Sequence, residues 1–302
     1  SVSLLHSVLP ETGDPIPMFV TYWNLKTNPF LNTFDRSMLF AGDQHEEAIA
    51  RFTFLAESGR LAGLLTGPYG VGKSTVLQHV ALAVEPHLPV IRMDAIPEGQ
   101  LPMLRHILAR MKIEGPAGSL PEALMTLGNA ASDLSDKLTR TLLCIDEAHY
   151  LATDNGLYLV HYLTNLRLLN TRTQKETPLF TIILAGIPEL LAAVQADPSL
   201  NQRMHMVYTL APLDESQTTA YIQEHMRAVG GDLWVFTKDA LAAIHRFSGG
   251  IPRTINLLCD TALMLGFAAK ANHVEASIIT QAATDTGIAA RQSPHPAPEI
   301  IP

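Results

Sequence analysis

A nine-residue stretch from Gly67 to Thr75 constrains this chain more than any other part of its 302 residues. It follows the apolar run Leu61–Leu65 and precedes a helical pattern over 76–84, so it joins a predicted strand to a predicted helix. The stretch fits the pattern G-x-x-x-x-G-K-[ST], whose glycines let successive backbone N–H groups point at a polyphosphate. A glycine-rich turn that arises by chance is the alternative, and the strand–helix context disfavours it. The sequence therefore predicts a site for a nucleoside triphosphate made of Gly67, Pro68, Tyr69, Gly70, Val71, Gly72, Lys73, Ser74 and Thr75.

Two side chains of this loop have predicted roles of their own. Lys73 is expected to reach the β- and γ-phosphates, where its charge offsets theirs. Ser74 is expected to bind Mg²⁺ through its hydroxyl group. The expected cofactors are therefore ATP and Mg²⁺.

A second motif combines four apolar residues, 142–145, with two carboxylates, Asp146 and Glu147. This pattern is typical of a buried parallel strand whose C-terminal end is acidic. Open α/β sheets bind ligands at the carboxyl ends of their strands, so Asp146 is expected to hold Mg²⁺ through water. Glu147 is expected to polarise the water that attacks the γ-phosphate. A solvated strand end is the alternative, but the phosphate loop upstream favours the catalytic interpretation.

Apolar runs and helical patterns alternate along most of the chain and then give way to helices alone. Five strands are expected, which indicates a parallel sheet with helices on both faces: 61–66, 90–93, 141–146, 179–185 and 206–210. A helix is expected over 156–171, with Arg167, Arg172 and Lys175 towards its end. After Pro212 the patterns predict four helices, over 214–229, 238–247, 252–268 and 274–283.

These patterns predict an α/β fold with a small all-helical domain after it. Asp214 and Thr237 are expected to cap the first two of the later helices. The expected domains are a poorly ordered lead at 1–20, an α/β nucleotide-binding domain at 21–210, a helical domain at 211–286 and a Pro-rich tail at 287–302.

Composition limits the classes of function. The formal net charge of −8 gives no basic footprint for nucleic acid, and 211–286 carries five basic against eight acidic residues. Cys144 and Cys259 lie in apolar segments and are predicted to be buried hydrophobic residues rather than a bridge. No window approaches the ~20 apolar residues that a membrane helix needs, and the first twenty residues lack a signal peptide pattern. A cytoplasmic protein is expected, with membrane association through a partner or a missing segment left open.

Histidines and aromatic residues leave further interpretations. His45, His149 and His161 show no metal-binding spacing and are interpreted as structural or surface groups. Asn28, Pro29 and Phe30 have two open interpretations: they cover the edge of the core, or they frame a pocket for the adenine base.

Taken together, these motifs resemble an AAA+ ATPase, and most of all the ExeA-like group of the general secretion pathway. The resemblance covers Tyr22 to Ala283 and depends most on the runs 184–190 and 248–256, Leu-Ala-Gly-Ile-Pro-Glu-Leu and Ser-Gly-Gly-Ile-Pro-Arg-Thr-Ile-Asn. It also includes 143–149 and the residues Tyr22, Leu25 and Asn28-Pro29-Phe30. ATPases that regulate transposition share much of this pattern. The resemblance implies a P-loop AAA+ core with a five-stranded parallel sheet and a helical lid.

The same resemblance implies roles for two arginines. Arg253 matches the sensor-2 arginine, which contacts the γ-phosphate from the lid, and Arg203 matches the arginine finger inserted into a neighbouring subunit's site. A surface arginine and a loop arginine are the alternatives. The sensor-1 position, which is usually polar, holds Ile187 here, so hydrolysis could be slow or the polar group could come from elsewhere.

The implied function is ATP hydrolysis that drives assembly or remodelling of a protein partner, by a homo-oligomer in the form of a ring or filament. The secretion ATPase also has a transmembrane segment and a peptidoglycan-binding module, which would make this chain a part of such a protein or a soluble relative. The alternative is a DNA-binding ATPase of a transposition machine, to which Arg167, Arg172 and Lys175 could contribute charge. A helicase is disfavoured because the chain has one phosphate loop and one α/β domain.

Overall fold

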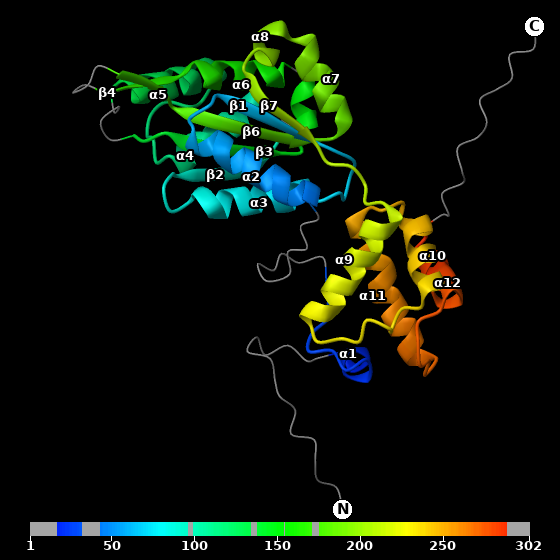
Figure 1. Cartoon of the computed structure of the whole chain (residues 1–302). Coiled ribbons are helices and arrows are strands. Elements are labelled where there is room, and N and C mark those ends of the chain that lie inside the picture. Colours follow the sequence, from blue (N-terminus) through cyan, green and yellow to red (C-terminus); the bar gives the residue numbers. More distant parts are fainter. Residues whose placement is uncertain are drawn as a thin grey trace, which may run out of the picture. The chain divides into compact units, whose positions relative to one another are not determined.

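The structure is a computed structural model that describes residues 17–31, 43–95, 99–133, 138–153, 155–170 and 175–288. The chain divides into two compact units (Figure 1). The α/β unit spans Asp43–Ala211, and the helical unit combines the described parts of 1–42 with those of 212–302.

A five-stranded parallel sheet lies at the centre of the α/β unit, in the order β2-β3-β6-β1-β7. Its strands are β1 Ala62–Thr66, β2 Val90–Asp94, β3 Thr141–Asp146, β6 Phe180–Gly186 and β7 Met204–Thr209. The predicted α/β fold with five parallel strands is therefore confirmed.

Helices cover both faces of this sheet because its central strands alternate between two apolar cores. In β3, Leu143 and Ile145 face one core while Leu142 and Cys144 face the other. The first core is covered by α4 Gln100–Arg110, α5 Leu120–Asp133, the 3-10 helix η2 Ala148–Ala152, α6 Gly156–Asn165, α7 Pro188–Ala196 and α8 Pro198–Asn201. The second is covered by α2 Asp43–Glu57 and α3 Lys73–Val84. Burial of both faces explains why these strands read as continuous apolar runs.

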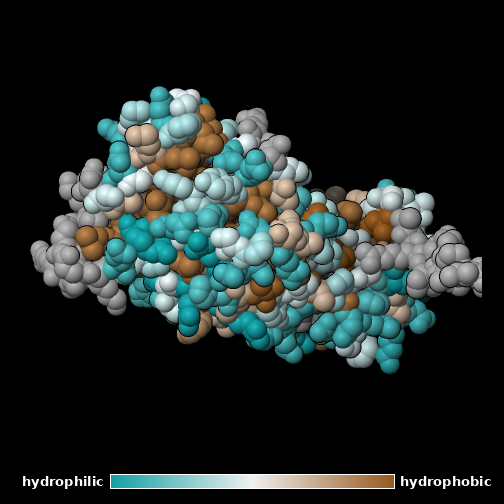
Figure 2. Space-filling model, turned by 90° about the horizontal axis from the view of Figure 1, so that it is seen from above, coloured by the Kyte–Doolittle hydropathy of each residue, from teal (hydrophilic) through white to brown (hydrophobic). Residues whose placement is uncertain are grey.

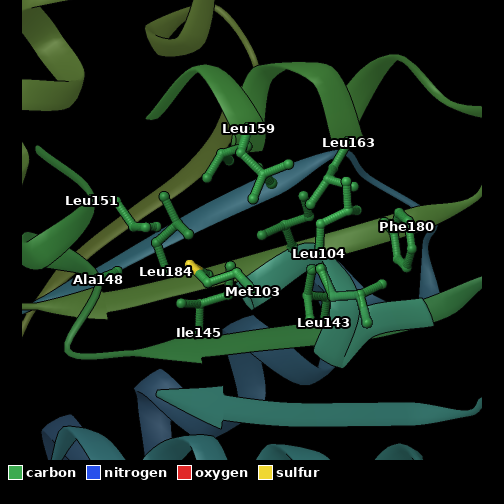
Figure 3. Close-up of a cluster of buried hydrophobic side chains, with 14 of the residues drawn as sticks. Met103, Leu104, Leu143, Ile145, Ala148, Leu151, Leu159, Leu163, Phe180 and Leu184 are labelled. Atoms are coloured by element: carbon green, nitrogen blue, oxygen red, sulfur yellow. The ribbon is translucent and has the colours of Figure 1, made fainter. Parts of the chain in front are cut away.

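Figure 3 shows how the first core fixes the strand ends in place. Leu143 and Leu184 project from neighbouring strands towards Met103 of α4 and Leu159 of α6. All four side chains are at most 1% exposed. Each contributes about 1.5–3 kcal/mol from burial, which stabilises the packing of β3 and β6 against these helices.

The helix predicted over 156–171 is confirmed up to Asn165 and is wrong after it. Helix α6 ends at Asn165, and an antiparallel hairpin follows, made of β4 Arg167–Asn170 and β5 Lys175–Pro178. Leu168 is 5% exposed and packs in the core, so the apolar residues after α6 follow a period of two. A short apolar run cannot distinguish a helix from a strand by its period. Arg167 therefore lies on a strand, and Arg172 falls outside the described residues.

The helical unit contains α1 Met18–Tyr22, α9 Glu215–Ala228, α10 Lys238–Ser248, α11 Pro252–Ala268 and α12 Ala276–Asp285. The predicted caps are confirmed: Asp214 accepts the backbone N–H of Gln217 at 2.8 Å, and Thr237 accepts that of Ala240 at 3.2 Å. The backbone N–H of Gln217 also holds the pKa of Asp214 below its usual value.

The N-terminal segment differs from the prediction in two respects: where its ordered part begins, and which unit it belongs to. Val20, assigned to the poorly ordered lead, is fully buried in α1, and Trp23 and Phe30 lie in the core of the helical unit rather than beside the sheet. The indole N–H of Trp23 donates to the carbonyl oxygen of Leu263 at 2.9 Å. Order along the chain suggested that residues before the first strand stay with it, but burial of these aromatics places them with the later helices. Of the predicted lead and tail, 1–16 and 289–302 fall outside the described residues.

Cysteines and surface complete the comparison with the predictions. Cys144 and Cys259 are free and buried, as expected, and burial raises the pKa of Cys144 to about 12. None of the described helices combines the length and apolar character required to cross a membrane. On the face seen in Figure 2, apolar areas of limited size lie between hydrophilic ones.

Candidate nucleotide-binding site

The carboxyl ends of three adjacent strands meet at one edge of the sheet. Strand β6 separates β1, which leads into the phosphate loop, from β3, which ends at Asp146. The backbone N–H of Gly67 donates to the carbonyl oxygen of Gly186 at 3.2 Å, so the loop starts directly beside the end of β6. Two strand spacings, about 10 Å, separate the backbone of the loop from that of Asp146, a gap that fits a phosphate chain and a small cation.

The phosphate loop has the backbone that the motif requires. Gly67, Gly70 and Gly72 all have positive φ angles, and α3 begins directly after them at Lys73. The ammonium group of Lys73 donates to the carbonyl oxygens of Gly67 at 2.8 Å and Pro68 at 3.0 Å. A cation is thus held over a ring of inward backbone groups at the positive end of a helix dipole, which is an arrangement for binding phosphate.

His45 of α2 supports this loop from behind. The side chain is 6% exposed, and its Nε2 lies 2.9 Å from the carbonyl oxygen of Val71, to which it donates. A Cβ atom on Gly72 would lie 2.7 Å from that same nitrogen, and the φ of Gly72 is +108°. Position 72 therefore requires glycine for its backbone conformation and for the close approach of His45.

We expect His45 to make stability depend on pH. Burial lowers its pKa below the ordinary value of 6.5, although the Val71 contact opposes the shift. As the pH falls through 6.5, the unfolded chain gains a proton that the native chain does not, so the free energy of unfolding falls until the native pKa is reached. His225 in the helical unit is also shifted down by burial and acts in the same direction.

Thermal unfolding measured between pH 7 and 5.5 tests this expectation. His45→Gln keeps a donor for Val71 but does not titrate, so its unfolding temperature should fall less with acidification than that of the parent chain. The exposed His87 provides the matched control in His87→Gln. An equal pH slope in the parent and His45→Gln would contradict the assignment.

At the end of β3 the chain turns so that both carboxylates stay near the sheet edge. Glu147 has φ +48°, in the left-handed region, and its backbone N–H donates to Oδ1 of Asp146 at 2.9 Å. The turn leads into η2, which brings His149 back towards Glu147, with His149 Nδ1 3.3 Å from Glu147 Oε2. The other ring nitrogen of His149 lies 3.2 Å from the hydroxyl of Tyr69 in the phosphate loop.

His149 lies close to the predicted base Glu147, which the sequence interpretation did not anticipate. It was assigned a structural or surface role because its spacing fits no metal site. Its place between Glu147 and Tyr69 depends on the left-handed turn at Glu147, and no periodicity reports such a turn. The one available signal was the position of His149 two residues after the predicted base.

The donor set is suited to Mg²⁺ bound largely by phosphate and water. Among the residues that the structure describes, no group of three or more His, Cys, Asp or Glu side chains is placed to hold a metal ion. Magnesium in phosphate sites usually takes one or two protein ligands and keeps several waters. Ser74 at the start of α3 and Asp146 at the end of β3 fit that need, since both flank the edge where the phosphates are expected.

Arg203 lies beside His161 of α6. It follows α8, and its Nη2 lies 3.1 Å from Nε2 of His161, which also lies 3.0 Å from the hydroxyl of Ser199. The Nε of Arg203 is buried, and within the described part of the chain it has no hydrogen-bond partner. The structure therefore holds one edge of the Arg203 guanidinium group against His161. The sequence interpretation had assigned His161 a structural or surface role.

Arg253 belongs to the helical unit, where it is exposed in the first turn of α11. The residues around it have structural reasons: a Cβ on Gly250 would collide with the backbone of Leu213, whose N–H donates to the Gly250 carbonyl oxygen at 2.9 Å. Asn256 accepts the hydroxyl hydrogen of Tyr221 at 2.9 Å and so joins α11 to α9. Packing thus accounts for Gly250 and Asn256 in the run Gly-Gly-Ile-Pro-Arg-x-x-Asn, whereas Arg253 is exposed.

Two other predicted positions are now placed. Ile187 follows β6 beside the phosphate loop and is half-buried, so the position that the resemblance matches to sensor 1 lies at the carboxyl end of β6. Phe30 is 2% exposed in the helical core, and the side-chain amide of Asn28 donates to Asp260 at 2.7 Å. Contact of Asn28, Pro29 and Phe30 with adenine stays a prediction.

Comparison with known proteins agrees with this geometry. Residues 56–194 match a family model described as an AAA domain. Among solved structures, the ORC2 protein of Aeropyrum pernix in its ADPNP-ADP complexes superposes with a TM-score of 0.62 at 15% identity, over 85% of this chain and 71% of that chain. Drosophila ORC bound to DNA gives 0.66 at 14%, over 96% and 71%, and Thermotoga maritima RuvB, a Holliday junction branch migration motor, gives 0.55 at 17%, over 85% and 73%. These identities show the fold alone. The family match shows that residues 56–194 are an AAA domain, and the sheet order and phosphate loop give this domain the P-loop fold of an ATP hydrolase.

One curated relative of this chain is general secretion pathway protein A of Aeromonas hydrophila. The two sequences are 30% identical over 257 residues, which is 83% of this chain and 45% of that protein. The chain thus spans less than half the length of this relative.

Proposed function

We propose that this chain binds ATP with Mg²⁺ and hydrolyses it at an interface between subunits, to drive assembly or remodelling of a protein partner in secretion or export. The observation that supports the pathway is the 30% identity over 83% of the chain to general secretion pathway protein A. Because that match spans more residues than the α/β unit contains, it includes part of the helical unit. The proposed setting is the cytoplasm, where ATP is available.

The geometry of the sheet edge supports the proposed chemistry. The backbone from Gly67 to Thr75 would hold the phosphates, with Lys73 on the β- and γ-phosphates. Ser74 and Asp146 would hold Mg²⁺, which when bound offsets the charge on the phosphate oxygens. Glu147 accepts a proton from the attacking water as the bond from the γ-phosphorus to ADP breaks.

Two arginines complete the proposed site. Arg203 would enter the site of a neighbouring copy, since a planar, permanent cation stabilises charge on the transferring phosphoryl group. Arg253 would act from the helical unit of the same chain and couple that unit to the nucleotide. A site that takes Arg203 from a neighbouring copy requires a homo-oligomer, either a ring or a filament.

The rate of ATP hydrolysis measured against protein concentration, with and without duplex DNA, tests this function. We expect the rate per subunit to rise steeply with concentration in the absence of DNA, because each site needs a neighbour. A rate per subunit that is flat at all concentrations would contradict the shared site.

DNA separates the two candidate pathways in the same assay. Strong stimulation by DNA that weakens with added salt would favour the alternative, a DNA-binding ATPase that regulates transposition. The acidic balance of the chain, with a net charge of −8, favours the absence of such stimulation.

A further inference from the structure

The contact between His149 and Glu147 is the feature of the site that the proposed function does not yet use. The two atoms that face each other, Nδ1 of His149 and Oε2 of Glu147, are 3.3 Å apart and both buried. Neither atom meets hydrogen-bond geometry with any partner among the described residues, including each other. Buried polar atoms normally find partners, and at 3.3 Å these two atoms are placed so that a small side-chain rotation would make each the partner of the other.

The contact that Nε2 of His149 makes with Tyr69 indicates which ring nitrogen of His149 carries the hydrogen. The hydroxyl of Tyr69 lies 3.2 Å from His149 Nε2. Partial desolvation, followed by the charge of nearby groups that include Glu147, raises the pKa of Tyr69. Tyr69 therefore keeps its hydrogen, and when it donates that hydrogen to Nε2 the imidazole hydrogen lies on Nδ1, facing the carboxylate.

We propose that His149 is the positioning residue for Glu147, held in turn by Tyr69, and that it supplies the polar group that the sensor-1 position lacks. The inference rests on the proposed role of Glu147 as the base. His149 fixes Oε2, while the side chain of Glu147 is still 37% exposed and its other oxygen is left for the attacking water. A base held at one oxygen has fewer orientations to sample before it meets the water.

The location of His149 explains how it can stand in for the residue after β6. A Cβ atom on Gly186 would lie 3.1 Å from the backbone nitrogen of His149, so η2 packs directly on the end of β6. The next residue, Ile187, has no polar atom in its side chain. The polar group therefore comes from the neighbouring strand end, and Tyr69 ties it to the loop that carries the phosphates.

Two amide variants of His149 separate its two contacts. The amide of Asn lies where Nδ1 lies, and that of Gln lies where Nε2 lies. We expect His149→Ala to lower kcat about tenfold with nucleotide affinity unchanged. His149→Asn should restore most of the rate, because it can still donate to Glu147, whereas His149→Gln should resemble His149→Ala. The exposed His106 provides the control His106→Asn.

The Tyr69→Phe variant tests the other end of the chain of contacts. Its loss should be smaller, about threefold, and should disappear when it is combined with His149→Ala, because both act through one imidazole. Unchanged kcat in His149→Ala, or equal losses in His149→Asn and His149→Gln, would overturn the proposal.

The Glu147→Gln variant separates the proposed role of Glu147 as the base from the proposed positioning role of His149. If Glu147→Gln hydrolyses ATP at the parent rate, the proposed base itself is wrong. If Glu147→Gln stalls while His149→Ala is fully active, the base stands and the positioning role alone fails.

Discussion

Glu147→Gln should bind ATP as tightly as the parent chain and hydrolyse it about 10²- to 10⁴-fold more slowly, the range expected for loss of a general base. The substitution keeps the size of the side chain and its left-handed turn at the end of β3, and it removes only the capacity to take a proton. Single-turnover hydrolysis, measured alongside binding of a fluorescent ATP analogue, separates the chemical step from binding.

Lys73→Ala should give the opposite pattern, in which binding fails first. The Lys73 ammonium group lies over the phosphate loop, where charge-assisted hydrogen bonds contribute about 1.5–3 kcal/mol each. Affinity for ATP should therefore fall by about tenfold to a hundredfold. The exposed Glu85, beyond the C-terminal end of α3, gives the control Glu85→Gln.

If Glu147→Gln instead loses affinity for ATP and keeps the parent rate of hydrolysis, the carboxylate of Glu147 acts on the nucleotide rather than on the water.

The two motifs proposed to hold phosphate and Mg²⁺ could be found in the sequence because each is a local string with a physical requirement. The phosphate loop is identified by a lysine that follows three spaced glycines. The acidic strand end is identified by two carboxylates that follow an apolar run. Their meeting at one edge also followed, since parallel strands place their carboxyl ends together. The sequence therefore predicted the phosphate loop, the acidic strand end and their meeting at the carboxyl ends of the strands, but not the order of the strands.

The parts that the sequence did not predict depend on contacts between distant residues. Nothing near Trp23 indicates that its indole donates to Leu263, 240 residues later, and so places the N-terminal segment with the later helices. The hairpin after α6 was hidden because its apolar residues fit two periods. The link from Tyr69 through His149 to Glu147 needs a left-handed residue, which is rare outside glycine and has no sequence signature.

Arg203→Ala should abolish most hydrolysis when every subunit carries it, and the loss should be reversible by mixing. An arginine finger contributes about 10³- to 10⁵-fold to turnover. The alternative is that Arg203 only holds His161 and Ser199 together, in which case its loss would lower stability and leave the rate per folded subunit unchanged. Unfolding temperature measured beside the rate separates the two, with the exposed Arg110→Ala as the control.

Mixing Arg203→Ala with Lys73→Ala subunits then tests whether the arginine acts on a neighbour. Neither variant is active alone, but an Arg203→Ala subunit keeps its phosphate loop and a Lys73→Ala subunit keeps its arginine. In a head-to-tail assembly of equal parts, about a quarter of the interfaces pair the intact loop with the intact arginine, so about a quarter of the parent rate should return. No recovery in a mixture that still assembles would show that Arg203 acts within its own chain, and the site proposed between subunits would have to be abandoned.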